Sequence, residues 1–446
     1  MDNLTFFSYS SQTPSRQGER WRELFFLGGL FLAAFLLFTF NLGNLPLLNP
    51  EETIIAKIAQ EIGQYPLLSG GWLFPTLGGE PYHQYPFLGP FLISLAYLCD
   101  QMTEWTTRFP GAFLGAISVP LLYGVGREIF VKRLPALLSA LIYLTLFPVI
   151  HQGRLGMMDG VILFWEILTV FCLLRSRRNL RWSLGVGLSL SGLLLTQGTI
   201  GGLLGLTIFL FLAWDIPRLL SSRYFWAGMS LGLLPAMSWY GVQWAYYGQS
   251  FGQEMFLKPL QNNWKMFSTD GLFYIMEMVK YSLPWLIFAF YGWQLARKSL
   301  MWGWAKLIIL WGIVYLLNFL LIPGSPIRCL IPLCPPLALA GGIALTEVYN
   351  GPSSRSYPQS WAIILLALSG LITLVCLTIL LNFPFDWSYL HDQGLVSLNL
   401  AAVALTFGTT AMLIWQRNAQ FIAVLIWGMY VSLLLFMSSS HWGWSV

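Results

Sequence analysis

The chain has 446 residues, of which 56% are hydrophobic and only 10% are charged, and its mean hydropathy is +0.64. No soluble globular domain of this length has such a composition, so the sequence predicts an all-α polytopic membrane protein. The net charge is +5, but the basic residues are scattered among short connections, which excludes nucleic-acid binding. The five cysteines form no CxxC pair, so neither a disulfide framework nor a zinc knuckle is indicated.

The first apolar segment, residues 24–40, follows a polar stretch and is not followed by a small-residue cleavage site. We expect it to be a signal anchor, with residues 1–23 as a cytoplasmic tail. The next connection, residues 42–108, is expected to lie on the outer side of the membrane. It is the first place where polar residues are dense enough to form a site.

This outer connection carries the motif Asn-Pro-Glu-Glu-Thr. Asn49 can cap a helix, Pro50 suits the first helical position, and Glu52 sits at the third position, where a capping box takes an acid. A helix is therefore predicted over residues 50–64. Its apolar side chains recur at helical spacing, which is typical of a helix lying on a membrane surface: Ile54, Ile55, Ile58 and Ile62.

Two interpretations of the acids in this first turn remain open. Glu51 and Glu52 could simply complement the helix macrodipole. Alternatively, Glu51 is held at the membrane surface in its ionised form and acts as a general base.

About 13 crossings are predicted in all, an odd number that places the C-terminus outside. Residues 87–99 are too short for a crossing and are expected to be a re-entrant or surface helix. A further outer loop is predicted at 246–280, and the inner loops are too short for a nucleotide-binding domain. The spans after the first are expected near 109–126, 134–150, 160–174, 183–197, 199–214, 225–245, 281–296, 304–322, 329–346, 360–381, 398–415 and 420–437.

A second polar group lies at the outer junction of two spans, where His151, Arg154 and Asp159 fall within nine residues. Asp159 could merely cap the next helix while Arg154 reaches the interface. However, Glu166 follows seven residues later on the same helical face, and an ionisable group inside a span is a functional candidate by default.

Other cations on the outer side could hold a phosphate. Arg328 lies at the end of a span among prolines, and Lys258 lies in the 246–280 loop. Interface anchoring and simple solvation are the alternatives. A metal site of His83 with Glu51 or Asp159 is conceivable, but no HxxH or HExxH spacing exists, so no metal ligand is predicted and a divalent metal stays a minor alternative.

Four stretches in this order resemble one family of membrane enzymes. They are LLNPEETIIAKIAQEI with FPTLGGEPYHQYPFLG, then RFPGAFLGAISVPLLYGVGREIF, HQGRLGMMDGVILFWEIL and RCLIPLCPPLALAGG. They are similar to GT-C glycosyltransferases, namely the lipid A aminoarabinose transferase and the protein O-mannosyltransferases. The resemblance implies a GT-C type bundle with outer juxtamembrane helices and a catalytic core over 24–347, followed by C-terminal transmembrane helices over 348–446.

The resemblance also implies the chemistry. Such enzymes move a sugar from a polyprenyl-phosphate donor to an acceptor at the outer face of the inner membrane, here with inversion and with no certain cofactor. Glu51 and Asp159 match the family's two acids and would be catalytic. The residues implied for substrate and phosphate binding are Glu52, Tyr82, His83, Tyr85, Arg154, Lys258 and Arg328.

The chain departs from the family pattern at several cations. Tyr85-Pro86 stands where a Lys-Pro or His-Pro pair is expected, and Gln197-Gly198 stands where a Lys-Gly pair is expected. Two alternatives to the enzyme therefore stay open. One is a catalytically inactive relative that acts as a binding or assembly partner, and the other is a lipid or solute transporter. The sugar, the acceptor and the polyprenol are not specified.

Overall fold

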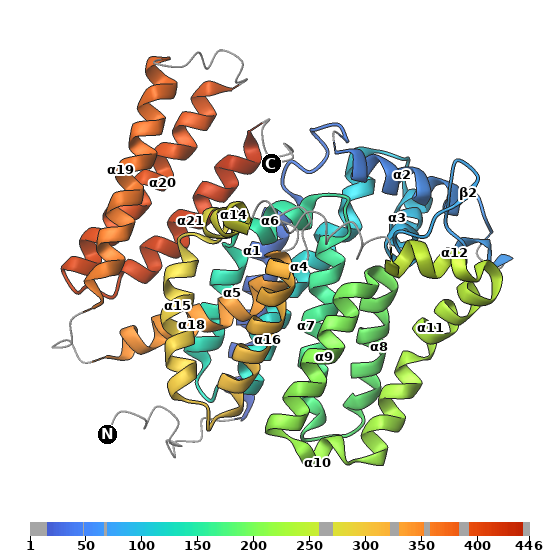
Figure 1. Cartoon of the computed structure of the whole chain (residues 1–446). Helices are drawn as coiled ribbons and strands as arrows, with labels where there is room; N and C mark the ends of the chain where they lie inside the picture. Colours follow the sequence, from blue (N-terminus) through green and yellow to red (C-terminus); the bar gives the residue numbers. More distant parts are fainter. Residues whose placement is uncertain are drawn as a thin grey trace.

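The computed structural model describes residues 16–47, 49–66, 69–257, 271–321, 330–351, 357–382 and 392–439. Helices dominate these residues, as predicted (Figure 1). The helices are Arg16–Thr39 (α1), Pro50–Gly63 (α2), Leu88–Cys99 (α3), Glu104–Ile129 (α4), Arg133–Leu144 (α5), Phe147–Arg154 (α6), Asp159–Ser176 (α7), Trp182–Thr196 (α8), Gly198–Asp215 (α9), Pro217–Leu220 (α10), Arg223–Tyr247 (α11), Gln249–Gly252 (α12), Gly271–Ser282 (α14), Trp285–Lys298 (α15), Gly303–Leu321 (α16), Cys334–Asn350 (α18), Gln359–Leu381 (α19), Gln393–Trp415 (α20) and Phe421–Ser438 (α21).

Within the described residues, most predicted spans coincide with one helix, but 134–150 covers α5 and the start of α6, and 281–296 covers the end of α14 and most of α15. The first helix begins at Arg16, so helical structure reaches into the predicted tail. Among the residues that the structure describes, seven helices are long and apolar enough to cross a membrane, and α5 and α6, bent by 54°, add an eighth if they form one span. The predicted number of 13 crossings therefore stays a prediction, because several apolar helices here are short.

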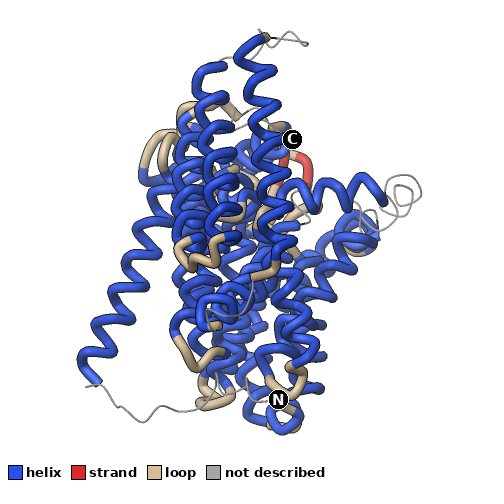
Figure 2. Tube along the Cα trace, turned by 90° about the vertical axis from the view of Figure 1, so that its left-hand side faces the viewer, coloured by secondary structure: helices blue, strands red, loops and turns tan. Residues whose placement is uncertain are grey.

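The helices run largely along one direction of the molecule, and the only described strands lie near one end (Figure 2). The strands Thr76–Leu77 (β1) and Glu80–Pro81 (β2) form an antiparallel hairpin. Gly78 and Gly79 make its turn with φ of 64° and 84°, a left-handed pair that glycine adopts without steric cost. Together with α2, α3 and α12, the hairpin lies at the upper right of Figure 1.

The first and last helices end side by side. The Asn41 side chain, just after α1, donates to the Met437 carbonyl oxygen near the end of α21 at 2.9 Å. The Tyr430 hydroxyl of α21 also donates to the Ala33 carbonyl of α1, so the two helices run in the same direction.

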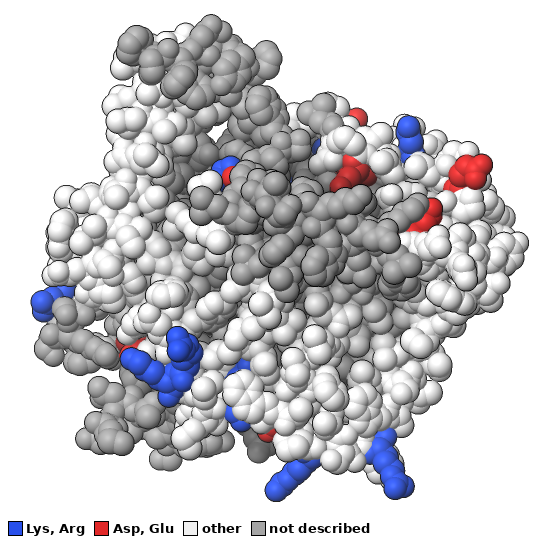
Figure 3. All heavy atoms as spheres, in the orientation of Figure 1, with Lys and Arg blue, Asp and Glu red and all other residues white. Residues whose placement is uncertain are grey.

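Charges separate between the two ends of the molecule. Lys and Arg lie mainly in the lower half of this face, whereas Asp and Glu appear mainly at the upper right, over α2 and the hairpin (Figure 3). At the lower end Glu23 accepts from both Arg127 and Arg133, which ties α1 to α4 and α5. By the positive-inside rule, the lower end would face the cytoplasm.

Candidate active site

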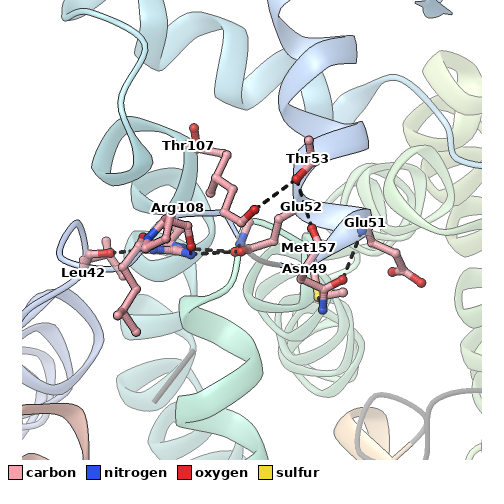
Figure 4. Close-up of polar contacts among 12 residues, drawn as sticks. Leu42, Asn49, Glu51, Glu52, Thr53, Thr107, Arg108 and Met157 are labelled. Carbon is pink, nitrogen blue, oxygen red and sulfur yellow. Dashed lines mark hydrogen bonds and ion pairs between the residues drawn. The ribbon is translucent and has the colours of Figure 1, made fainter. Parts of the chain in front are cut away.

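The acids of the first turn of α2 point in different directions. Asn49 caps the helix, since its side-chain oxygen accepts the backbone N–H of Glu51 at 3.1 Å. The expected capping box does not form, because the Glu52 side chain turns into the protein toward Arg108. The Glu51 side chain is half-buried and points away from that pair (Figure 4).

Glu52 is held by a buried ion pair that the sequence reasoning missed. The Arg108 Nε and Nη2 atoms donate to its two carboxylate oxygens at 3.1 and 3.0 Å, and both side chains are 1% exposed. The backbone N–H of Gly156 donates to the same carboxylate at 2.6 Å. This geometry favours a structural role for Glu52 over the substrate-binding role that the family resemblance implies.

Arg108 also joins α4 to the chain that leads into α2. Its guanidinium donates to the backbone carbonyls of Leu42, Leu45 and Pro46 at 3.1, 2.7 and 3.1 Å. A charged residue inside an apolar helix is expensive to bury and marks a special site. That rule, applied to the motif RFPG, could have identified Arg108.

Asp159 begins α7 at the same end of the molecule and is 1% exposed. A carboxylate at a helix N-terminus is stabilised by the backbone N–H groups and the helix dipole. The preceding Met158 has a φ of 70°, which is uncommon for a non-glycine residue and aims the chain into α7. The structure thus places the Asp159 carboxyl in the buried first turn of α7.

The two helices that carry these acids meet in one hydrophobic cluster. Ile55 and Ala59 of α2 share one hydrophobic cluster with Met158 and Val161 around the start of α7, and Ile93 of α3 completes it. Glu51 lies one turn before Ile55 on the same helical face. Glu51 and Asp159 therefore belong to neighbouring elements at one end of the bundle.

A narrow pocket of about 10 Å³, room for about one water molecule, lies between these two helices. Ile55 and Ile58 of α2 line one side, and Ile162 of α7 lines another. The predicted residues Tyr82 and Tyr85 also line it. Thr196 and Gln197 join them, although we singled neither out as a binding residue.

His83 and Arg154 are both turned away from this pocket. The His83 ring packs edge-on against Tyr247 and Phe251, at centroid distances of 4.6 and 5.5 Å. Burial lowers the pKa of His83, although nearby Glu254 opposes that effect.

The fully buried Arg154 is engaged with the end of α1. Its Nη1 and Nη2 atoms donate to the carbonyls of Leu37 and Phe40 at 2.5 and 2.6 Å. Such contacts satisfy carbonyls that a helix leaves without intrahelical partners. In this conformation Arg154 stabilises the α1–α6 junction, and this favours a structural role over the phosphate-binding role that we expected.

The remaining predicted cations, Lys258 and Arg328, lie outside the described residues. Within the described ranges, no group of three or more His, Cys, Asp or Glu side chains is close enough to hold a metal ion.

Comparisons with known proteins find membrane glycosyltransferases that resemble this chain. Residues 29–248 match the family described as dolichyl-phosphate-mannose-protein mannosyltransferase. Across 87% of its length the chain is 29% identical to an undecaprenyl phosphate-alpha-4-amino-4-deoxy-L-arabinose arabinosyl transferase of Pseudomonas fluorescens, of which it covers 70%. Its coverage of two further curated transferases is 63% and 67%, so it spans about two thirds of their length.

The fold has solved counterparts. ArnT from Cupriavidus metallidurans bound to undecaprenyl phosphate superposes with a TM-score of 0.72 over 96% of this chain and 78% of that one, at 17% identity. The Archaeoglobus fulgidus oligosaccharyltransferase tethered to an acceptor peptide gives 0.54 over 96% and 56%, at 12% identity. These structures confirm the predicted GT-C membrane fold, whereas the match over residues 29–248 and the 29% identical transferase confirm the predicted family resemblance.

Proposed function

We propose that this chain, whose residues 29–248 match the dolichyl-phosphate-mannose-protein mannosyltransferase family, is a membrane glycosyltransferase. It moves a sugar from a polyprenyl-phosphate donor to a lipid, glycan or protein acceptor. The observation that carries the proposal is the hydrophobic cluster shared by α2, α3 and the start of α7, which brings the helices of Glu51 and Asp159 close to each other. The similarity to the arabinosyl transferases supports the same donor class.

In the proposed reaction Glu51 is the general base. It takes the proton of the acceptor hydroxyl while the hydroxyl oxygen bonds to the anomeric carbon of the sugar. The bond from that carbon to the phosphate oxygen breaks, and polyprenyl phosphate leaves with the bonding electrons. Attack on the face opposite the phosphate inverts the anomeric configuration.

Asp159 has a different task, because it is buried at a helix N-terminus. An ionised carboxylate beside the anomeric carbon stabilises the positive charge that develops there. Arg328 and Lys258 remain the candidates for holding the departing phosphate, because the described contacts of Arg154 direct it to carbonyls of α1.

The protein is an integral membrane protein, and we infer that its site faces the periplasm. The basic residues at the end opposite α2 would then lie in the cytoplasm, together with the start of α1. Polyprenyl and acceptor lipids would reach the site from the surrounding bilayer.

The test is transfer of radiolabelled sugar from a panel of polyprenyl-phosphate sugars to a membrane extract by the purified protein. Wild type is compared with Glu51→Gln and Asp159→Asn, and Glu80→Gln, at an exposed acid of the hairpin, is the matched control. We expect Glu51→Gln to abolish transfer and Glu80→Gln to retain it. Unchanged activity in Glu51→Gln would reject the site, whereas no transfer from any donor would favour the inactive relative.

A further inference from the structure

A second cavity lies far from the acids, between α5 and α21. Its volume is about 520 Å³, within the range of ligand pockets, and Ala33 of α1 contributes to its wall. Apolar side chains dominate the lining, among them Leu134, Leu138, Leu141 and Leu144 of α5 and Ile422 and Ile426 of α21. No Asp, Glu, Lys or Arg is among the described residues that line it.

This cavity is an elongated groove between α5 and α21, and its length matches one lipid leaflet. Leu134 and Leu144 are ten residues apart on α5, which corresponds to roughly 15 Å at the α-helical rise. The hydrocarbon core of a bilayer is about 30 Å thick, so half of it matches this length. An apolar groove of this size is not expected to hold ordered water, because it offers water few hydrogen-bond partners.

Polar groups gather at one end of the groove, in the turn between α20 and α21. Asn418 and Gln420 line that end. The neighbouring Arg417 is exposed, with a φ of 56°, and its side chain has no partner among the described residues. Two amides and a guanidinium suit the oxygens of a phosphate group.

This polar end is opposite the candidate active site. The far end of α21 lies beside Asn41, on the side where the chain leads into α2. A lipid whose phosphate is held at the active site cannot place the same phosphate at Arg417. The occupant therefore belongs to the other leaflet.

We propose that the groove between α5 and α21 binds one chain of a membrane phospholipid, with the phosphate of the headgroup held by Arg417 and Gln420. The lipid fills the gap between the C-terminal helices and the core, where the Tyr430 hydroxyl donates to the Ala33 carbonyl at 3.0 Å. It acts as a structural ligand that attaches α21 to α1 and α5. This site does not depend on the proposed transfer activity.

The experiment is native mass spectrometry of the full chain released from membranes in mild detergent, counting bound phospholipids. Ala423→Trp places an indole in the groove, because Ala423 lines it. Ala367→Trp is the matched control, on an exposed position of α19 outside the groove. We expect wild type and Ala367→Trp to retain one phospholipid that Ala423→Trp loses.

A second variant tests the headgroup without blocking the groove. Arg417→Gln combined with Gln420→Ala should lower the fraction of protein that retains a phospholipid at least several-fold. If Ala423→Trp does not fold, this double variant tests the proposal in its place. Equal retention in every variant would overturn the proposal. A polyprenyl phosphate that wild type and Ala367→Trp retain and Ala423→Trp loses would also overturn it, because the groove would then serve the donor.

Discussion

Arg108 and Glu52 form a bidentate ion pair that is almost completely buried, with N–O distances of 3.1 and 3.0 Å. The pair joins α4 to the first turn of α2, beside the half-buried Glu51. The ion pair of Glu52 with Arg108 therefore fixes the helical turn that also carries Glu51, the base proposed for the reaction. Two adjacent glutamates thus have separate tasks, one in the fold and one in the chemistry.

The first prediction separates those tasks. Glu52→Ala leaves the Arg108 guanidinium buried without its counter-charge, and breaking a buried pair in this way costs about 3–5 kcal/mol. We expect a clear fall in the thermal unfolding midpoint in detergent. Glu51→Gln is the matched comparison and should keep the wild-type midpoint while losing transfer. A wild-type midpoint for Glu52→Ala would contradict the structural role.

The second prediction concerns the contact between α4 and α7. A Cβ atom at Gly160 would overlap the backbone oxygen of Gly111, and a backbone cannot move aside as a flexible side chain can. Gly160→Ala should therefore destabilise the protein by about 1–3 kcal/mol through overpacking. It should also reduce transfer, because it displaces the start of α7 next to Asp159.

Gly205 provides the control for this substitution. It lies in α9, and a Cβ atom there would meet nothing within 4 Å. Gly205→Ala should leave the unfolding midpoint unchanged or raise it slightly, since alanine favours the helix by about 1 kcal/mol. Equal unfolding midpoints for the two variants would contradict the prediction that the close packing of α4 on α7 leaves no room for a Cβ atom at Gly160. Thermal unfolding followed by fluorescence in detergent makes the comparison.

Local signals in the sequence predicted α2 to within one residue. Asn49, Pro50 and the spacing of the isoleucines all act within one or two helical turns, and the structure places α2 at Pro50–Gly63. The membrane spans were predicted for a similar reason, because apolar runs of that length exclude other structures. The predicted count of crossings was less secure where helices are short or bent.

Long-range partners could not be predicted in this way. Glu52 and Arg108 are 56 residues apart, and Arg154 reaches the Leu37 carbonyl 117 residues away. A capping box was a reasonable expectation for Glu52 from its local position, but a buried guanidinium competes more strongly for the carboxylate. Tertiary contacts therefore decided which of the predicted polar residues remain near the pocket.

The third prediction concerns pH and the hairpin. Glu61 of α2 accepts the Thr76 hydroxyl at 2.5 Å and the Gly78 backbone N–H at 2.6 Å. These hydrogen bonds, chiefly the one from Thr76, lower the pKa of Glu61 below its ordinary value of 4.5. Because the folded pKa is depressed, the stabilisation is complete above pH 4.5 and is lost as the pH falls through the folded pKa.

Limited proteolysis of the hairpin at graded pH measures this effect. We expect cleavage near Gly78 to increase as the pH falls below 4.5 in wild type, after correction for the activity of the protease. In Glu61→Gln, cleavage should be raised at every pH and should depend less on pH. A wild-type hairpin equally protected at pH 3 and pH 7 would show that Glu61 does not hold it.

The fourth prediction concerns Glu166, the acid inside a span that the sequence marked as a functional candidate. It is fully buried on α7, and its Oε1 atom accepts the indole N–H of Trp311 on α16 at 2.8 Å. Glu166→Gln keeps a carbonyl oxygen for the indole, so stability and transfer should be close to wild type. Glu166→Leu leaves the N–H of Trp311 buried and unpaired, which costs about 1–3 kcal/mol.

The double variant Glu166→Leu with Trp311→Phe distinguishes a structural role for Glu166 from a functional one. If the pair only joins α7 to α16, removing both polar groups should recover much of the stability lost in Glu166→Leu, and transfer should recover with it. Thermal unfolding and transfer rates measured on the same preparations provide both readouts. Loss of transfer in Glu166→Gln with an unchanged unfolding midpoint would instead show that the carboxyl group itself takes part in function.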